Sequence, residues 1–259
     1  LFLAGVLPGV LSLAGMLLVI FLWTRAHPED APVPDEQIST RDRWQALANA
    51  WPAMMLFVFI IGGIYGGVFT ATEAAAVSLS FAVIYGFISK RLSWDNFIIA
   101  MKDTVKQSAS IFFIAAGAKM FVAFVSLTGL TRDVLALTEY YQMADWSILL
   151  TIVIIYLVMG MFLDPLGIML LTLPFVIPLV EGMGLDLIWF GVVVVKLLEI
   201  GLVTPPVGLN VFIINSVVGP KAPVHTIFRG VLTFLMADIA VFALIVLFPI
   251  IALLLPNSQ

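Results

Sequence analysis

A run of helix-breaking residues lies in the middle of an apolar segment that is long enough to cross a membrane. The segment is Trp189–Val218, and its centre, Gly201–Asn210, reads Gly-Leu-Val-Thr-Pro-Pro-Val-Gly-Leu-Asn. Pro205 and Pro206 lack N–H donors, and their rings clash with the preceding helical turn. The helix must therefore open at a depth where hydrocarbon cannot satisfy unpaired peptide groups, so the break has to face protein or a wet cavity. Secondary transporters build ion and substrate sites from such breaks.

Composition places the chain among polytopic helical membrane proteins. Of its 259 residues, 62% are hydrophobic and 11% are charged, whereas an average soluble domain is about a quarter charged. The sequence contains no cysteine, which excludes disulfides, thiol catalysis and zinc–thiolate sites. It starts with Leu1 inside an apolar segment, without an initiator Met or the charged region of a signal peptide, so we expect a fragment of a longer protein.

Apolar segments predict an all-α chain that crosses the membrane several times. The interface helix is expected at Trp94–Gln107, and a polar, Pro-rich connection occupies Thr24–Arg43. The expected apolar segments, in chain order, are Leu1–Trp23, Trp51–Tyr65, Thr70–Ser89, Ser108–Thr128, Trp146–Leu163, Leu166–Val180, Trp189–Val218 and Val231–Leu255.

The placement of basic residues predicts the orientation. If Trp146–Val180 is a hairpin that enters and leaves from one side, the connections on the other side hold nine basic residues: Arg25, Arg41, Arg43, Lys90, Arg91, Lys102, Lys106, Lys221 and Arg229. The opposite connections hold Arg132 alone. The positive-inside rule then places the nine-residue set in the cytoplasm and the C-terminus outside. Charge does not separate a re-entrant hairpin from two full spans, but a short second arm with Pro174 and Pro178 favours the re-entrant form.

Asp164 is a candidate functional residue because it stands between two apolar segments and precedes Pro165. A carboxylate at bilayer depth is costly and by default marks a function. It could neutralise a bound cation, directly or through the groups that ligate the cation. Alternatively it could cap the helix that begins near Leu166 by accepting free N–H groups. We favour the ion site, and the two roles are compatible.

The opened turn offers oxygen atoms that suit a small cation. Thr204 supplies a hydroxyl, and the turn supplies carbonyl groups. Sodium, like other hard cations, prefers such ligands. A proline kink repaired by neighbouring helices is the alternative. Two prolines between two glycines, with Thr204 and Asn210 alongside, favour a site.

A second break is predicted between the segments that end near Tyr65 and begin near Thr70. Thr70 and Glu73 match a capping box, which satisfies the exposed N–H groups at a helix start. This structural interpretation of Glu73 is favoured over a functional one. Close helix packing or a hinge would explain the four glycines of the break, which are Gly62, Gly63, Gly66 and Gly67.

Four other charged residues lie in apolar segments. Lys196 and Glu199 are three residues apart and can pair on one helix face, with a proton relay as the less favoured interpretation. Lys119 could extend to the interface or meet a buried carboxylate. Asp238 needs a partner that the sequence does not assign.

Enzymatic functions find little support in the sequence. The two histidines, His27 and His225, lie in connections, and neither a His-Glu-x-x-His pattern nor a Walker A loop occurs. An intramembrane enzyme with Asp164 as its catalytic carboxylate lacks a convincing second residue. A purely structural subunit would have no use for exposed backbone at mid-membrane. We therefore expect a transporter rather than an enzyme.

Three segments resemble the large membrane subunit of TRAP transporters (tripartite ATP-independent periplasmic transporters). The segment Gly201–Phe212, GLVTPPVGLNVF, is similar to a characteristic segment of that subunit. Gly66–Val77, GGVFTATEAAAV, resembles a second one, in which Pro usually stands at the position of Ala71. Gly160–Pro165 with Leu173-Pro174 and Ile177-Pro178 resembles its second hairpin. The start of the chain, at Leu3–Gly9, resembles the region after the first discontinuous helix, so the first half of the subunit would be missing.

The resemblance implies an elevator-type architecture in three parts. Residues 1–107 would contain scaffold-type spans, the interfacial arm helix and the Gly-rich break. Residues 108–218 would form half of a transport domain, with the re-entrant hairpin at about 146–180 and the broken helix at about 189–218. Residues 219–259 would contain the terminal transmembrane helix.

The resemblance also implies sodium-coupled import of a small organic acid anion, a carboxylate or a sulfonate, across the bacterial inner membrane. A periplasmic substrate-binding protein would deliver the substrate, and a small membrane subunit would brace the large one. Na⁺ is the only cofactor expected; the other partner is the lipid bilayer, and no nucleic acid is expected. The alternative is a divalent anion:sodium symporter, which shares the architecture and works without a binding protein.

Carried over residue by residue, the resemblance implies two sets of site residues. The sodium ligands would be Asp164, Gly201, Thr204 and Gly208. The substrate would meet Thr204, Pro205, Pro206, Asn210 and Pro165.

Overall fold

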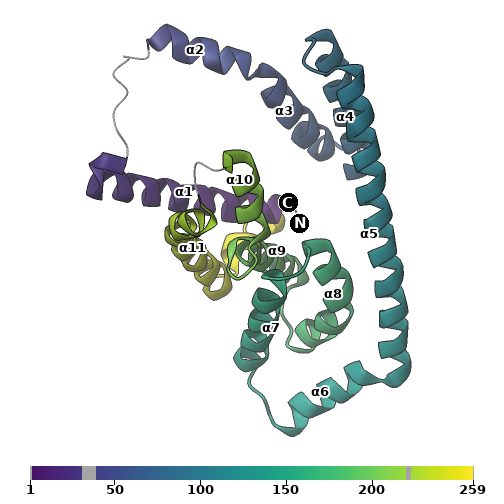
Figure 1. Cartoon of the computed structure of the whole chain (residues 1–259). Helices are drawn as coiled ribbons and strands as arrows, with labels where there is room; N and C mark the ends of the chain where they lie inside the picture. The colour runs from purple at the N-terminus through teal and green to yellow at the C-terminus, as the bar shows by residue number, and fades with distance from the viewer. Residues whose placement is uncertain (1, 31–38, 220–222, 259) are drawn as a thin grey trace. The chain divides into compact units, whose positions relative to one another are not determined.

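The computed structural model describes residues 2–30, 39–219 and 223–258, and within these ranges the regular structure is entirely helical (Figure 1). The predicted all-α class is confirmed. Leu1, residues 31–38 of the Pro-rich connection, and Lys221 lie outside the described residues. The helices are α1 (Phe2–Ala26), η1 (Pro28–Asp30), α2 (Thr40–Asn49), α3 (Trp51–Tyr65), α4 (Ala71–Ile88), α5 (Trp94–Thr128), α6 (Leu130–Tyr140), α7 (Asp145–Gly160), α8 (Pro165–Gly182), α9 (Leu187–Val203), α10 (Leu209–Val218), α11 (Val224–Leu247), α12 (Ile250–Leu253) and η3 (Pro256–Ser258).

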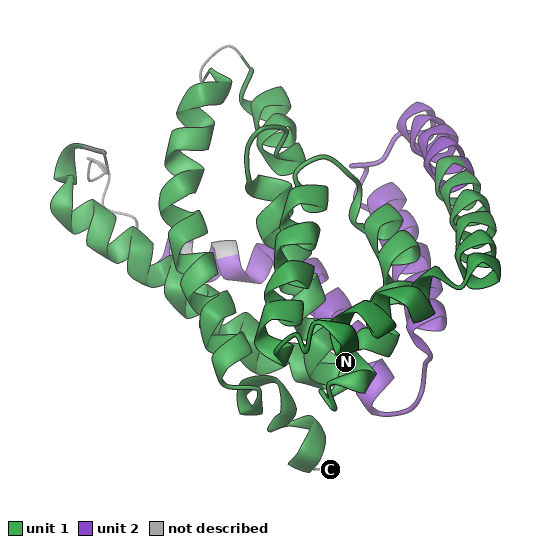
Figure 2. Ribbon diagram, turned by 90° about the horizontal axis from the view of Figure 1, so that it is seen from below, with its two compact units in different colours: residues 1–31, 110–259 green, residues 32–109 purple. Residues whose placement is uncertain are grey.

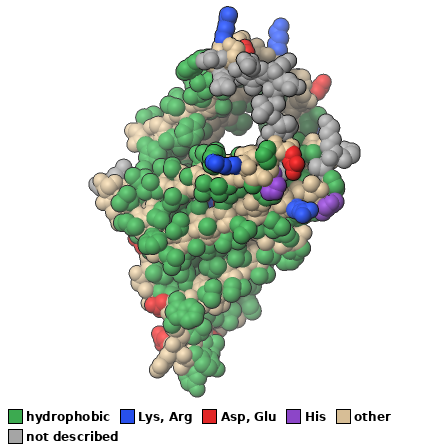
Figure 3. Space-filling view, turned by 90° about the vertical axis from the view of Figure 1, so that its left-hand side faces the viewer, with side chains coloured by type: hydrophobic (Ala, Val, Ile, Leu, Met, Phe, Trp, Pro, Cys, Tyr) green, Lys and Arg blue, Asp and Glu red, His purple; other side chains and the backbone are tan. Residues whose placement is uncertain are grey.

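Five of the described helices are long and apolar enough to cross a membrane, namely α1, α4, α5, α8 and α11. Three shorter apolar helices, α3, α7 and α10, accompany them. The face shown in Figure 3 is dominated by hydrophobic side chains, and few charged ones interrupt it. Apolar surface of this extent on exposed helices needs hydrocarbon around it. The chain is therefore a multi-pass membrane protein.

Helix α5 differs from the sequence-based expectation of an interfacial helix followed by a span. It runs without interruption over 35 residues, a length of about 50 Å at 1.5 Å per residue. The polar residues of its first half change the surface of the helix but not its backbone, because no proline falls within it. Gly129, with φ of +72°, ends it. Helix α6 then begins at Leu130, where we expected only a connection.

The chain divides into two compact units, coloured separately in Figure 2. Unit 1 consists of residues 1–31 and 110–259, and unit 2 of residues 32–109. The division predicted above, into scaffold and transport parts, concerns movement and stays a prediction.

In unit 1, helix α9 is the centre of the core and packs against α1, α7, α8, α10, α11 and α12. Apart from Lys196 and Glu199 its residues are apolar, and most of them are buried, as expected of a helix with neighbours on several sides. Phe190, Val193 and Leu197 are fully buried in the cluster that these helices form. The indole Nε1 of Trp189 donates a hydrogen bond to the carbonyl of Ile245 in α11 at 2.9 Å. This bond satisfies the one polar atom that Trp189 brings into the core.

Helices α7 and α9 approach until their backbones touch. A Cβ atom added to Gly201 would lie 2.7 Å from the Cα of Gly160 and 2.9 Å from its carbonyl carbon. Gly201 therefore requires glycine, and a Cβ at Gly160 would lie only 3.0 Å from the Cα of Gly201, so this position also favours it. The contact holds the end of α7 against the last turn of α9, just before the helix opens.

Helices α7 and α8 form a hairpin through the turn 161–164. The hydroxyl oxygens of Tyr156 and Thr172 lie 2.6 Å apart, and Thr172 also bonds the carbonyl of Ile168 at 2.7 Å. Since a carbonyl can only accept, Thr172 donates to Ile168, and the fully buried Tyr156 donates to Thr172. The structure confirms the two-armed hairpin as helices; re-entry into the membrane stays a prediction.

Unit 2 contains α2, α3, α4 and the first part of α5. Trp51, at the start of α3, packs edge-on against Tyr85 and Phe81 of α4, with ring centroids 5.4 Å and 6.4 Å away. Helix α3 closes with two bonds of a Schellman motif, from the amide of Val68 to the carbonyl of Gly63 at 2.9 Å and from Gly67 to Ile64 at 3.2 Å. The predicted break between these segments is therefore a tight helix–helix turn.

The glycine contact between α7 and α9 predicts a stability effect. Gly201→Ala forces the two backbones apart, so we expect a loss of about 1–3 kcal/mol, measured as a lower thermal unfolding midpoint of the detergent-solubilised full-length protein. Gly117→Ala is the matched control, because its Cβ would meet nothing within 4 Å and alanine favours the helix. Equal midpoints for Gly201→Ala and the unchanged protein would contradict the role of the contact.

Candidate functional site

The predicted break is present in the structure. Helix α9 ends at Val203, α10 begins at Leu209, and residues 204–208 between them are not helical. The peptide bond between Pro205 and Pro206 is cis. Gly208 has φ of +58°, a backbone conformation that residues other than glycine rarely adopt. A Cβ there would also lie 2.9 Å from the ring of Phe228 in α11. Both the backbone conformation and the lack of space therefore require glycine at this position.

The prolines leave carbonyl groups of α9 without their helical donors. Pro205 and Pro206 stand four residues after Gly201 and Leu202, where an N–H would close the helical bond. The carbonyl of Gly201 recovers a bond from the amide of Thr204 at 3.1 Å. Among the described residues, no backbone donor replaces the missing bond to Leu202. The last turn of α9 thus presents backbone oxygen to the break.

Thr204 places its hydroxyl beside these carbonyls. Its Oγ1 donates to the carbonyl of Ile200 at 2.6 Å, which leaves the lone pairs of Oγ1 available as an acceptor. The carbonyl oxygen of Thr204 lies 3.4 Å from the Cβ position of Gly208. Thr204 and Gly208 are therefore neighbours across the turn, and Asn210 follows in the first turn of α10 with its side chain half-buried.

Asp164 caps helix α8. Its Oδ2 accepts a hydrogen bond from the amide of Gly167 at 3.1 Å, and Pro165 takes the first helical position, where its missing N–H costs nothing. The capping interpretation of Asp164 is confirmed. Its exposed carboxylate carries a further oxygen that the cap does not use, and the cation role stays a prediction.

The structure brings the hairpin and the broken helix together at the contact between Gly160 and Gly201. Asp164 follows Gly160 by four residues, and Thr204 follows Gly201 by three. The Gly160–Gly201 contact therefore links the hairpin turn to the break. No hydrogen bond joins the side chains of Asp164 and Thr204 in the described structure.

The chemistry of this place suits a hard, singly charged cation. In the described ranges, no three His, Asp or Glu side chains gather into a group that could hold a metal ion. The break offers carbonyl oxygens and one hydroxyl, and the hairpin turn offers the carboxylate of Asp164. Neutral oxygens with at most one carboxylate match a singly charged ion better than a transition metal, which favours nitrogen or sulfur.

The second break holds a structural cap, as predicted. The amide of Thr70 donates to Glu73 Oε2 at 2.8 Å, and the amide of Glu73 donates to Thr70 Oγ1 at 3.3 Å. This reciprocal pair is the capping box, and it starts α4. The structural interpretation of Glu73 is confirmed.

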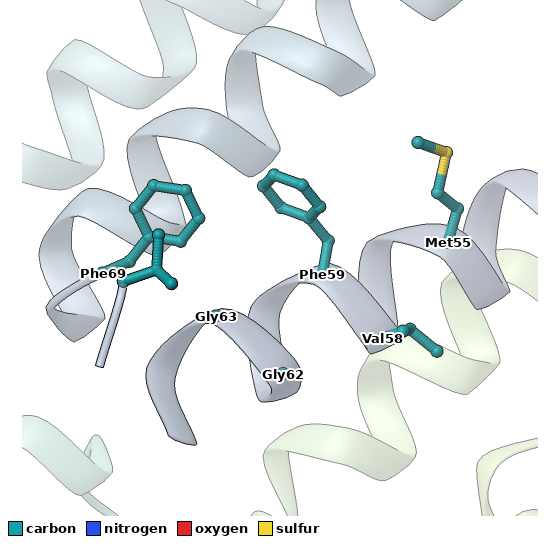
Figure 4. Close-up of a pocket in the computed structure, with 7 residues that line it drawn as sticks. Met55, Val58, Phe59, Gly62, Gly63 and Phe69 are labelled. Atoms are coloured by element: carbon teal, nitrogen blue, oxygen red, sulfur yellow. The ribbon is translucent and has the colours of Figure 1, made fainter. Parts of the chain in front are cut away.

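The glycines of this second break make room for aromatic side chains. Phe69 folds back over Gly63, where a Cβ would lie 2.5 Å from its ring, and its ring centroid is 5.5 Å from that of Phe59 (Figure 4). Met55, Val58 and Gly62 line the same apolar hollow. The glycines thus serve packing at this turn.

Asp238 has a partner that sequence reasoning did not assign. Lys196 Nζ lies 2.7 Å from Asp238 Oδ1 and 3.1 Å from Glu199 Oε2. Lys196 is 5% exposed and Asp238 8% exposed, whereas Glu199 is exposed. The predicted Lys196–Glu199 pair is present, but the buried partner comes from α11, 42 residues away. The one available signal was that Asp238 lacks a partner in its own apolar span, whereas Lys196 is a charged residue in another.

Comparison with known proteins identifies the family of the chain. The profile of the family described as "Tripartite ATP-independent periplasmic transporter, DctM component" matches residues 1–251. The chain is 34% identical over 262 residues to the sialic acid TRAP transporter large permease protein SiaM of Vibrio cholerae. It is 32% identical over 260 residues to the C4-dicarboxylate TRAP transporter large permease protein DctM of Pseudomonas aeruginosa. Each alignment covers 99% of this chain and 59% of the relative, and the chain corresponds to the C-terminal part.

A third relative gives the same result. The chain is 34% identical over 261 residues to the C4-dicarboxylate TRAP transporter large permease protein DctM of Rhodobacter capsulatus, with 99% of this chain and 58% of the relative aligned. The chain belongs to the DctM family of tripartite ATP-independent periplasmic transporters. The resemblance noted from its three segments is confirmed.

The buried ion pair predicts an asymmetry between single and double variants. Lys196→Met leaves Asp238 charged and unpaired in the core, so we expect a loss of about 3–5 kcal/mol. Adding Asp238→Leu removes the stranded charge and should recover most of that loss. Thermal unfolding of the full-length protein measures both. Glu199→Gln, which removes the exposed partner of the same lysine, should cost under about 1 kcal/mol.

An equal loss in Lys196→Met and in the double variant would show that the stranded charge is not the cause. The pair would then matter through side-chain volume alone.

Proposed function

We propose that this chain, as part of a DctM-family permease, imports a small organic acid anion by secondary transport coupled to sodium. Because the chain spans about three fifths of its relatives' length, the activity belongs to the whole protein. The chain would supply one of its two sets of hairpin and broken helix. An elevator movement of this part within the bacterial inner membrane would carry the bound substrate across.

The observation that carries the proposal is the opened helix at residues 204–208, next to the hairpin turn. The Gly160–Gly201 contact supports a site that both elements share. Sodium would be held by carbonyl oxygens of Gly201 and Gly208, the hydroxyl of Thr204 and the carboxylate of Asp164. Dehydrated sodium needs several such oxygens at once, and the opened backbone would supply them.

The substrate class follows from the chemistry of the same place. Two relatives are named for C4-dicarboxylates and one for sialic acid. The start of α10 has no side-chain cap, so its first amides form a positive helix end, which would attract a carboxylate. Pro205, Pro206 and Asn210 stand at this end and Pro165 stands at the hairpin turn, and they would contact the substrate with Thr204.

Two partners are part of the proposal. The family's description names a tripartite periplasmic system, which supports a periplasmic substrate-binding protein and a small membrane subunit besides this permease. The C-terminus would lie in the periplasm, because the nine-residue basic set would face the cytoplasm. Family membership favours this arrangement over the alternative of a divalent anion:sodium symporter that needs no binding protein.

Two substitutions test the proposed sodium site while leaving the cap of helix α8 in place. Asp164→Asn keeps a side-chain oxygen for the cap but removes the charge, and Thr204→Val keeps the shape but removes the hydroxyl. Each should raise the sodium concentration for half-maximal uptake roughly tenfold, which corresponds to about 1.4 kcal/mol. Uptake by the complete transporter in proteoliposomes measures this.

The matched control is Thr104→Val in α5, because Thr104 also donates its hydroxyl to the carbonyl four residues earlier. It should leave the sodium response unchanged. If Asp164→Asn and Thr204→Val respond to sodium as the control does, the site does not hold the ion.

The binding protein provides a second test. Proteoliposomes that contain the two membrane subunits should take up substrate only when the loaded periplasmic protein is added outside. Full uptake from free substrate alone would favour the symporter alternative.

A further inference from the structure

Lys119 is a charged residue in the apolar half of helix α5, which is long and apolar enough to cross a membrane. It is the one charged side chain between Ser108 and Thr128, and it is exposed on the helix surface. At 1.5 Å per residue, it stands about 14–17 Å from the ends of this stretch. Its four-carbon stem is shorter than that distance, so its ammonium group stays at bilayer depth.

A charge at this depth needs an opposite charge beside it. Among the described residues, no carboxylate forms an ion pair with Lys119. The carboxylates at membrane depth in the described part of unit 1 are engaged elsewhere. Asp164 caps α8, and Asp238 and Glu199 both bond Lys196. The partner of Lys119 therefore has to come from outside this chain.

Lys119 faces away from the hairpin on which α5 packs. Ile114 Cγ2 lies 3.8 Å from the Cβ position of Gly167 in the first turn of α8. One step further along both helices, the ring centroids of Phe121 and Phe175 are 5.9 Å apart (Figure 1). With 3.6 residues per turn, Lys119 lies about 140° around the helix from Ile114 and about 160° from Phe121. A substrate held at the hairpin turn would therefore not reach Lys119.

The surface around Lys119 suits a closely packed helix. Ala115, Ala116 and Ala123 share this face of α5 with the lysine, and the last two are exposed. Small residues allow helix backbones to approach one another within a membrane. A phospholipid tail brings no negative charge to this depth, because its phosphate stays at the level of the head groups. A helix that carries a carboxylate meets both requirements.

The relatives contain a source for such a helix. The chain aligns with 59% of SiaM of Vibrio cholerae and 59% of DctM of Pseudomonas aeruginosa, and it corresponds to the C-terminal part. We propose that the face of α5 around Lys119 docks a membrane helix of the N-terminal part of the permease, and that an Asp or Glu of this helix pairs with Lys119. The proposal rests on family membership and does not depend on sodium coupling.

Lys119→Met gives opposite results for a paired lysine and for one that faces lipid. If the lysine is paired, the variant leaves a carboxylate unpaired at bilayer depth, and the thermal unfolding midpoint of the complete transporter should fall by about 5 °C or more. If the lysine faces lipid, removal of its charge should raise the midpoint. A rise or no change would overturn the proposal. Lys102→Met, at an exposed position in the polar half of the same helix, is the matched control and should leave the midpoint unchanged.

A second substitution identifies the source of the carboxylate. In the Lys119→Met protein, each Asp and Glu in the apolar segments of the N-terminal part is replaced in turn by Asn or Gln. One replacement should recover most of the lost midpoint, because no unpaired charge then remains. Recovery from a replacement in the small membrane subunit instead, or from none, would contradict the proposal.

Cross-linking covers the case in which Lys119→Met does not fold. Benzoylphenylalanine in place of Ala123, one turn from Lys119 on the same face, should react on irradiation with a peptide of the N-terminal part of the permease. The same group in place of Phe121 is the control and should label α8 near Phe175. A cross-link from position 123 to lipid or to the small subunit, or none while the control reacts, would rule out the proposed contact.

Discussion

The helix packing of unit 1 depends on the peptide groups of the break, because peptide groups cannot remain unpaired in hydrocarbon. Pro205 and Pro206 remove the donors for two carbonyls at the end of α9, and lipid offers no replacement. The chain meets this constraint by burying α9 at the centre of its helices and by bringing α7 into backbone contact through Gly160 and Gly201. The polar opening is thus enclosed by protein on the side of the hairpin. The same constraint acts at α8, where Asp164 satisfies an amide that lipid could not.

The two breaks look alike in sequence but differ in whether their backbone groups are hydrogen-bonded within the turn. Both combine glycines with a threonine. At the turn between α3 and α4, the capping box and the Schellman bonds satisfy the backbone internally. At residues 204–208, prolines prevent such closure, and oxygen atoms stay available. The presence of proline, more than that of glycine, therefore separates a candidate ion site from a structural turn.

Local chemistry made much of the fold predictable. The helix ends at Tyr65 and Thr70, the cap of Glu73 and the opening at Pro205 and Pro206 all depend on neighbours within about five residues, so the sequence contains their causes. The continuity of α5 was missed because its polar residues were taken as a change of element, although nothing in them breaks a helix. Helix α6 was missed because an 11-residue helix is too short to register as a span. The partner of Asp238 could not be predicted, because it depends on how α9 and α11 pack across 42 residues of separation.

The contact between Lys196 and Asp238 has an electrical consequence. A lone lysine in the membrane interior would tie the position of its helix to the transmembrane potential, by about 2.3 kcal/mol for each 100 mV crossed. The carboxylate of Asp238 lies 2.7 Å away in a helix of the same unit, so the two buried charges cancel, and the membrane field exerts no net force on that pair. The exposed Glu199, 3.1 Å from the same lysine, then leaves the group of three with one negative charge at its exposed side.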